Sequence, residues 1–415
     1  MSDKEPMWDS LPPEFLTHAF LQLPIKSIIT CTCVSKKWKS LIQNPSFISS
    51  HLHHSSSNSK NHLLLFRLCP NEGTKWDKRE REAYTLYWDN NNNNSNNEED
   101  LNEHTRFDSP FPAQSGSVIV RVVGTCNGLL CLARDLLSYD NFYILWNPCV
   151  RKFTRTSKPI VSYSTHGGFE ETTGFGFDSK TNDYKVVRVV RLLDREDEDG
   201  SSLKVEVYSL ATDGWRMVTA GLPSSCVVRG REPLAFVNGA LHWIAFRRAI
   251  SNNFQSFVMV FDLGDEVIRE IALPEFLNGF DGDQYWVRMS ISVYRNSLAL
   301  FHQQDFSSPC LNIWVMKEYA DESSWTKIFT LSDDQCSREY VPRALGFRRS
   351  GEVIIEMHDG QLISLHFESQ KFKVLGITGY GYIFDHSING NGYTFFDSYV
   401  ESLVLLDEPN RAVTY

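Results

Sequence analysis

The sequence lacks the features that mark a secreted or membrane-spanning protein. No stretch approaches the roughly 18 consecutive apolar residues that a membrane-spanning helix needs. The charged residues Lys4 and Glu5 are followed by no apolar segment, so we expect no secretory signal. The 9 cysteines are scattered and odd in number, which is typical of reduced thiols. We therefore expect a cytoplasmic protein, a nuclear protein or both, with no membrane contact.

Motifs for catalysis and cofactor binding are also missing. Neither a G-x-x-x-x-G-K-[ST] phosphate loop nor a G-x-S-x-G nucleophile turn occurs. Cys31 and Cys33 are too closely spaced for a usual zinc knuckle, and no second cysteine pair follows. His242 is predicted to be a buried core histidine, and Asp178 and Asp183 are predicted to cap turns at strand ends. We expect no catalytic residue, no cofactor and no metal.

The balance of charge argues against one class of partner. Acidic residues number 51 against 41 lysines and arginines, which gives a net charge of −10. Such a chain is a poor generic binder of nucleic acid. Hydrophobic residues at 42% and charged residues at 22% are ordinary for a globular protein, and aromatics at 13% favour β structure.

Residues 8–50 carry the pattern of three short helices. Phe15, Leu16 and Phe20 fall at helical spacing before Pro24, and a second apolar stripe begins at Ile25. A third stripe includes Trp38 and stops at Asn44-Pro45. About 45 residues with this much apolar surface cannot bury it alone. Either a partner or the rest of the chain must cover the excess.

The order of residues in this segment resembles an F-box, the helical module that docks on the Skp-type adaptor of a cullin-RING ubiquitin ligase. An ordinary helical cap on the next domain is the alternative. The resemblance implies adaptor contacts from Leu11, Pro12, Glu14, Phe15, Leu16, Phe20, Leu23, Pro24, Ile28, Val34 and Trp38.

The next segments of the chain differ in composition from the helical segment. Residues 51–61 are rich in serine and histidine and are predicted to be a polar linker. Residues 62–116 are predicted to be irregular, with two strands over 62–68 and 83–88 and an Asn-rich disordered loop.

A repeat occupies residues 117–415. A turn signal precedes an apolar strand at Asn127, Asn182, Asn238, Asn296 and Ser350, at spacings of 55, 56, 58 and 54 residues. Near-constant periods and four strands per repeat indicate a β-propeller. Five full blades can be written, and a sixth has three C-terminal strands, over 381–386, 392–396 and 402–407. We expect an N-terminal strand to complete it and close a ring of about six blades.

This segment resembles the kelch-like F-box-associated domain of plant F-box proteins. The matching residues are Cys126-Asn127-Gly128-Leu129, Trp146-Asn147-Pro148, Gly174-Phe175-Gly176-Phe177-Asp178, Asp183-Tyr184-Lys185-Val186-Val187, Val207-Tyr208-Ser209 with Trp215, and Asn238-Gly239 with Leu241-His242-Trp243. The fold implied is a small all-α F-box followed by an all-β kelch-like propeller. The function implied is a non-catalytic substrate receptor of an SCF-type ubiquitin ligase, linked through the adaptor to a cullin.

Long connections between strands are predicted to gather on one propeller face, where loops on a rigid scaffold suit recognition. We expect an unknown protein target there, with Arg231, Arg248, Tyr285 and Trp286 among its anchors. An acidic loop over 194–199 favours a basic target. Two alternatives stay open: an enzyme or small-molecule binder with a site in the central channel, and a non-degradative scaffold. The former requires titratable residues that converge on the innermost strands.

Overall fold

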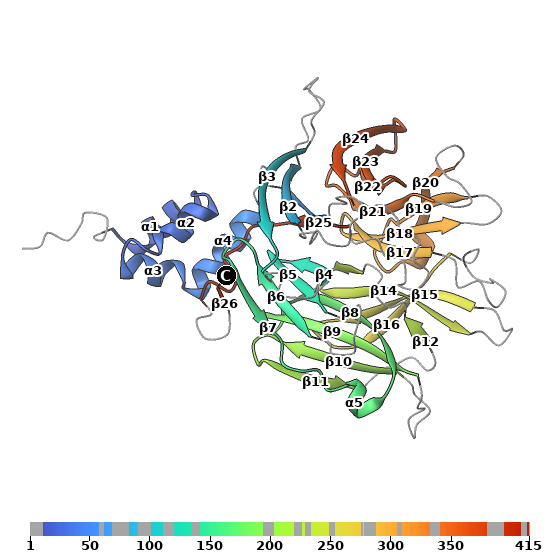
Figure 1. Cartoon of the computed structure of the whole chain (residues 1–415), viewed down its shortest axis with the longest axis horizontal. Helices are drawn as coiled ribbons and strands as arrows, with labels where there is room; N and C mark the ends of the chain where they lie inside the picture. Colours follow the sequence, from blue (N-terminus) through green and yellow to red (C-terminus); the bar gives the residue numbers. More distant parts are fainter. Residues whose placement is uncertain are drawn as a thin grey trace, which may run out of the picture.

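The computed structural model places helices at one end of the molecule and a ring of β-sheets at the other (Figure 1). It describes residues 11–57, 62–68, 83–89, 101–110, 120–134, 142–193, 203–219, 226–228, 234–248, 254–274, 277, 288–304, 309–332, 341–379, 394–407 and 413–414.

The N-terminal helices are α1 (Pro13–Leu21), α2 (Ile25–Cys31), α3 (Lys36–Ile42) and α4 (Pro45–Ser57). Helix α4 lies between the other three and the sheets (Figure 1). The prediction of a polar linker over 51–61 is wrong for 51–57, which continue α4, and 58–61 lie outside the described residues. His51 is buried, so this histidine-rich stretch packs against the protein instead of only facing solvent.

The described strands form six sheets, and each is one blade of a propeller. The first blade consists of β4 (Arg121–Cys126), β5 (Leu129–Ala133), β6 (Tyr143–Asn147) and β7 (Lys152–Arg155), and the second of β8 (Phe169–Asp178), β9 (Asp183–Leu192), β10 (Leu203–Ser209) and β11 (Gly214–Val218). The third blade consists of β12 (Cys226–Val228), β13 (Ala235–Val237), β14 (Ala240–Arg248), β15 (Phe254–Asp262) and β16 (Ile268–Ala272). The fourth consists of β17 (Arg288–Tyr294), β18 (Ser297–Gln304), β19 (Cys310–Met316) and β20 (Trp325–Leu331), and the fifth of β21 (Arg343–Phe347), β22 (Val353–Glu356), β23 (Gln361–His366) and β24 (Lys371–Thr378).

The sixth blade joins the two ends of the chain. Its strands are β25 (Phe395–Tyr399), β1 (Leu63–Leu68), β2 (Ala83–Asp89) and β3 (Leu101–Asp108), in that order. Leu65 of β1 lies opposite Asp397 of β25 in an antiparallel register. Contacts run around the ring through β4, β8, β14, β17, β21 and β25, and β25 contacts β4. The ring is therefore closed without an open sheet edge at its centre.

The predicted closure by an N-terminal strand is confirmed, but its details differ. Three N-terminal strands take part, so the expectation of two strands over 62–116 missed β3. Residues 404–407 form a turn where a strand was expected. A short C-terminal strand, β26 (Val413–Thr414), pairs with β7 in the first blade.

The turn signals in the repeat act as predicted. Asn127, Asn182 and Asn238 have φ of 51°, 54° and 53°, each in the tight turn after the innermost strand of a blade. Positive φ suits the hairpin turns that match the strand twist, and asparagine tolerates it better than most residues. Arg295 takes this conformation in the fourth blade, with φ of 54°.

Apolar side chains between neighbouring blades form the core. Six clusters of buried residues lie at the six blade junctions, including the junction between the sixth and the first blade. There Tyr84 of β2 packs edge-on against Trp146 of β6, with ring centroids 4.8 Å apart. The N-terminal strands thus add apolar packing as well as backbone hydrogen bonds to the closure.

Candidate functional site

The residues predicted to bind an adaptor divide into a buried and an exposed group. Leu16, Phe20 and Ile28 are buried between the helices. Trp38 is partly buried and packs edge-on against Phe20, with ring centroids 5.0 Å apart. The hydroxyl of Ser35 accepts a hydrogen bond from the backbone N–H of Trp38 and caps α3. These four apolar side chains hold the helices together, so any effect on a partner is indirect.

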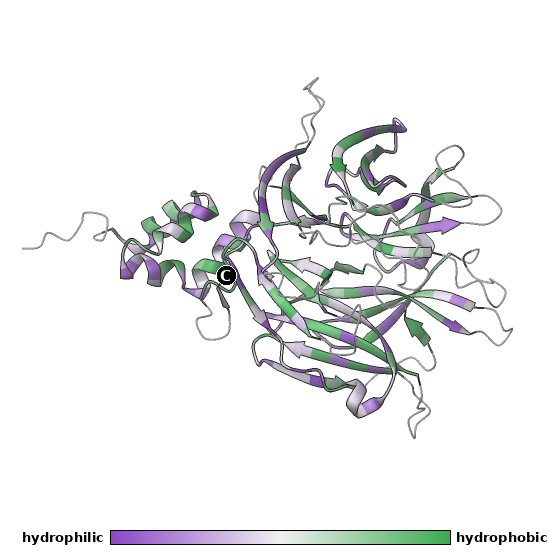
Figure 2. Cartoon of the chain, viewed as in Figure 1, coloured by the Kyte–Doolittle hydropathy of each residue, from purple (hydrophilic) through white to green (hydrophobic). Residues whose placement is uncertain are grey.

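The other predicted residues face outwards. Phe15 is 68% exposed, Val34 62% and Leu23 38%, and all three are large apolar side chains. Pro12, Glu14 and Pro24 are also exposed, and Leu11 is half-buried. Figure 2 shows apolar residues along α1 and α2, which lie on the side of α4 away from the sheets. These three exposed apolar side chains all belong to the same small helical module.

The helices are fixed to the propeller through a seam of apolar contacts. Val150, Leu403 and Leu406 of the propeller belong to the same buried cluster as Phe47 and Ile48 of α4. Sequence reasoning missed this seam because it assigned the apolar run from Ser402 to a strand of the sixth blade.

Hydrogen bonds hold the chain at 402–406 in the seam. The Gln43 side chain and the Lys152 ammonium each donate to the Leu406 carbonyl, both at 3.0 Å. The Asn147 amide donates to the carbonyls of Ser402 and Val404, at 2.9 and 2.8 Å. Burial lowers the pKa of His51 to about 4, against a smaller opposing effect of Glu401, so this histidine is neutral at the seam. The helices and propeller therefore meet at a packed joint.

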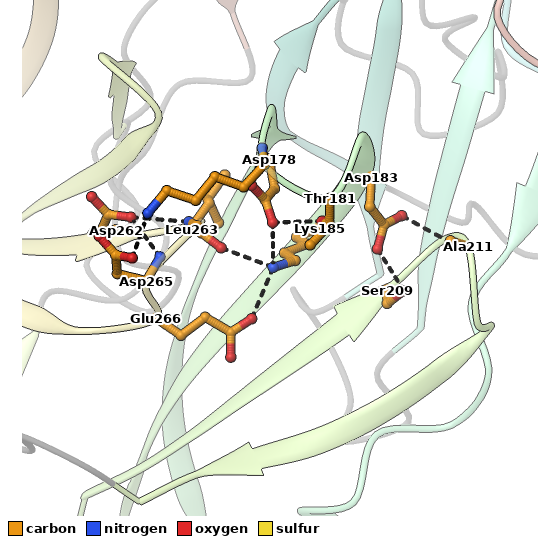
Figure 3. Close-up of polar contacts among 12 residues, drawn as sticks. Asp178, Thr181, Asp183, Lys185, Ser209, Ala211, Asp262, Leu263, Asp265 and Glu266 are labelled. Carbon is orange, nitrogen blue, oxygen red and sulfur yellow. Dashed lines mark hydrogen bonds and ion pairs between the residues drawn. The ribbon is translucent and has the colours of Figure 1, made fainter.

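A polar cluster outside the seam joins the second and third blades (Figure 3). Lys185 of β9 donates to Asp178, to Glu266 and to the carbonyl of Leu263, each at 2.8 Å. Asp178 also accepts from the Thr181 hydroxyl at 2.6 Å, as a turn cap does. Burial alone would raise the pKa of Asp178, but the hydrogen bonds from Lys185 and Thr181 outweigh it and lower the pKa to about 2. The cluster is a satisfied structural joint between blades.

We expect Lys185→Met to lower the free energy of unfolding by about 3–5 kcal/mol at neutral pH, because it leaves buried Asp178 without its cation. The folded pKa of Asp178, about 2, lies below its ordinary value of 3.8. Its contribution is therefore present above about pH 4 and is lost as the pH falls through about 2, so the difference between variant and wild type should shrink there. Urea unfolding across this pH range measures both effects.

Lys180→Met is the matched control for this prediction. Lys180 lies in the turn between β8 and β9 and pairs with Asp265, but its side chain is 57% exposed. Solvent screens such a pair, so the control should leave stability nearly unchanged. Equal losses in the two variants would contradict the structural role assigned to Lys185.

A cavity of about 800 Å³ lies at the centre of the ring. Its walls include the innermost strands β4, β17, β21 and β25, with β1 behind them. Asp397 of β25 lines it and accepts a hydrogen bond from the Thr125 hydroxyl of β4 at 2.6 Å. Burial raises the pKa of Asp397 to about 6. Arg67, Arg121 and Arg343 line the same cavity at the end from which the inter-blade connections leave. At the opposite end, the lining includes Asp89, Arg295, Arg348 and Arg349, and Arg348 pairs with Asp89 at 2.8 Å.

These cavity residues are the convergent titratable groups that sequence reasoning did not find. They come from β1, β4, β21 and β25, which are far apart in the chain and meet only when the ring closes. No spacing rule connects residues 67, 121, 343 and 397. A fold with assigned innermost strands is needed before they can be grouped.

The predicted roles of His242 and Asp183 are confirmed. His242 is buried, with one ring nitrogen at 3.1 Å from the Ala235 carbonyl and the other at 2.9 Å from the Tyr319 hydroxyl. Asp183 accepts from the Ala211 backbone N–H at 2.9 Å and from Ser209, which caps a turn (Figure 3). In the described part of the chain, no cluster of three or more histidine, cysteine, aspartate or glutamate side chains suits a metal ion.

The predicted anchors of the target face are not placed by the structure. Arg231, Tyr285 and Trp286 and the acidic loop over 194–199 lie outside the described residues. Arg248 is the last residue of β14, and nothing is described of its side chain. The first-to-second strand turns and the connections between blades leave from opposite ends of the blades, as predicted. The other connections follow the prediction only in part: residues 357–360 alone join β22 to β23 where a long connection was expected, and residues 317–324 and 90–100 separate β19 from β20 and β2 from β3 where tight turns were expected.

The described helices include none that is long and apolar enough to span a membrane. The chain was also compared with known proteins. The model of the F-box domain matches residues 8–50, and that of the F-box associated beta propeller domain matches residues 81–406. Among solved structures, the Dos1 propeller aligns over 72% of this chain and 67% of its own, at 8% identity and a TM-score of 0.35.

Three curated relatives from Arabidopsis thaliana align over 78% to 94% of this chain. F-box protein CPR1 is 28% identical over 89% of this chain and 84% of its own length. F-box protein At3g07870 is 27% identical over 94% and 93%, and F-box/kelch-repeat protein At3g23880 is 26% identical over 78% and 79%. With a helical F-box, a closed six-bladed ring and both family models matched, the chain belongs to the plant F-box proteins that carry an F-box associated β-propeller domain.

Proposed function

We propose that this protein is a substrate-recognition subunit of an SCF-type cullin-RING ubiquitin ligase. The observation that carries the proposal is the exposed apolar group of Phe15, Leu23 and Val34 on a module that is otherwise well packed. We assign the binding of a Skp-type adaptor to this surface, and through the adaptor a link to a cullin. The chain itself supplies no catalytic group in this proposal.

The packed seam supports a mechanism based on proximity. A flexible tether spreads its cargo over a large volume, whereas a fixed joint holds two partners at one separation. Here Val150, Leu403 and Leu406 join α4 to the side of the ring that carries the tight turns. A target held at the other side would face away from the adaptor at a set distance. Ubiquitin transfer to that target then becomes effectively intramolecular.

We propose the long-connection face as the target site, with Arg231, Arg248, Tyr285 and Trp286 as candidate anchors. This assignment rests on their residue types, on the positions of Arg231, Tyr285 and Trp286 between strands, and on that of Arg248 at the end of β14. The protein acts in the cytoplasm, the nucleus or both in this proposal, in keeping with its scattered cysteines.

Affinity purification with a stalled ligase, followed by mass spectrometry, tests the receptor role. The full-length chain should capture the Skp-type adaptor, the cullin and a target whose ubiquitination depends on this chain. The matched bait is a Phe15→Ala and Val34→Ala double variant, which should keep the target and lose the ligase. Capture of the ligase without any protein whose ubiquitination changes would support the non-degradative scaffold instead.

A further inference from the structure

We propose that the central cavity binds a small organic anion, with a carboxylate or phosphate held at the arginine end and an apolar body against the opposite wall. This site goes beyond the adaptor and target surfaces and does not depend on them. The cavity of about 800 Å³ is within the usual size range for a small-molecule site.

The arginine end is built by three neighbouring blades. Arg343 begins β21 of the fifth blade, Arg67 lies near the end of β1 in the sixth, and Arg121 begins β4 of the first. All three line the cavity at the end from which the long connections leave. They converge there because blades five, six and one are consecutive around the closed ring.

Backbone carbonyls orient two of these guanidinium groups. Arg67 donates to the Val120 carbonyl at 2.8 Å, next to Arg121 in the chain. Arg343 donates to the Thr394 carbonyl at 3.2 Å, and Thr394 precedes Phe395, the residue opposite Arg67 in the sheet. The three side chains are thus grouped around the start of β25. Planar guanidinium groups suit carboxylate and phosphate because they present paired N–H donors.

The acidic groups nearby have their own partners. Glu356 lies 3.8 Å from Arg343 and accepts from the Thr394 hydroxyl at 2.6 Å. Asp397, two residues beyond Phe395, accepts from the Thr125 hydroxyl and from the backbone N–H of Ser398. Among the described residues, this end of the cavity therefore holds three arginines and two carboxylates, one of which pairs with Arg343, and the excess of guanidinium groups favours an anionic ligand.

Several lining residues on the far side of the cavity are apolar. Phe175 of the second blade, Leu234 and Phe236 of the third, and Ile291 and Val293 of the fourth line it. An inorganic anion would use the arginines but gain nothing from this wall. A ligand that fits both sides has a charged head and an aromatic or aliphatic body.

The test uses the full-length chain and three probes that share one ring system. We expect 2-naphthoate and 2-naphthyl phosphate to bind saturably in isothermal titration calorimetry and to raise the melting temperature. The neutral 2-naphthamide keeps the apolar body without the charge and should bind at least about tenfold more weakly. Comparison of the affinities of 2-naphthoate and 2-naphthyl phosphate shows whether the site prefers a carboxylate or a phosphate head group.

Arg121→Gln should weaken both anionic probes at least about tenfold and leave 2-naphthamide unchanged, because it removes one charged donor pair. Arg121→Lys, which keeps the charge, should recover part of the loss. The control is Arg106→Gln, an exposed arginine on β3 of the sixth blade. The proposal is overturned if neither anion binds saturably, if the amide binds as tightly, or if Arg121→Gln behaves like Arg106→Gln. Unchanged melting of the free variants shows that each one is folded.

Discussion

Replacing Phe15 and Val34 together by alanine is expected to weaken binding of the Skp-type adaptor by roughly a thousandfold. Truncation of a buried interface anchor costs about 2 kcal/mol or more, and two such losses give this factor. Both side chains are more than half exposed in the free chain, at 68% and 62%, so the double variant should melt like the wild type. Titration calorimetry with purified adaptor measures the loss, and circular dichroism measures the melting.

The matched control for this pair lies on the propeller. Tyr163 and Ile160 are an aromatic and an aliphatic residue with 57% and 41% exposure, far from the helices in the chain. Their double alanine variant should bind the adaptor as the wild type does. Changing Leu23-Pro24 to alanines should act in the same direction as Phe15→Ala. Unchanged adaptor binding by the Phe15 and Val34 variant would refute the assigned surface.

The buried part of the same motif should respond differently. Leu16 is 2% exposed and packs in the helical core. Leu16→Ala leaves a cavity there and should cost about 2–5 kcal/mol of stability. Its effect on the adaptor would follow from unfolding of the helices, and a shift of their melting would reveal it. Comparison of the exposed variants with Leu16→Ala therefore distinguishes residues that contact the adaptor from residues that only hold the helices together.

A chain that begins at residue 115 is expected to aggregate or fail to fold, because it lacks β1, β2 and β3. Strand β25 would lose its sheet partner β1, and buried Leu132 and Trp146 of the first blade would lose their cover. An unpaired strand edge beside exposed apolar surface promotes association between chains. Size-exclusion chromatography and thermal melting measure the result.

A chain that begins at residue 58 is the control, since it removes the helices but keeps all three strands. It should remain a folded monomer, with some loss where Leu403 and Leu406 lose their cover. A monomeric chain from residue 115 that melts as cooperatively as this control would contradict the role given to the N-terminal strands.

Much of the fold follows from local signals in the sequence. The turn positions at Asn127, Asn182 and Asn238 show positive φ in the structure, and this local requirement recurs at the same position in the first three blades. The helical stripes at Leu16, Phe20 and Ile28 became the core of the helical module because apolar periodicity reports which face is buried. Such patterns can be recognised in the sequence because each one depends on only a few neighbouring residues.

Contacts between segments that are far apart in the chain were harder to predict from the sequence. The run after Ser402 is apolar enough for a strand, yet it forms the seam because α4 offers it a partner. The strand count of the sixth blade depends on pairing between segments more than 300 residues apart, such as Leu63 with Tyr399. The arginines of the cavity meet for the same reason. Such pairings depend on the closed ring, which no local pattern encodes.

The central claim is that the helices dock this chain on a Skp-type adaptor. Size-exclusion chromatography with light scattering of an equimolar mixture of the full-length chain and the purified adaptor tests it most directly. The account predicts one peak with the mass of a one-to-one complex, which shifts to a larger mass when the cullin is added. Two separate peaks with the masses of the free proteins, from a chain that is folded by circular dichroism, would contradict it.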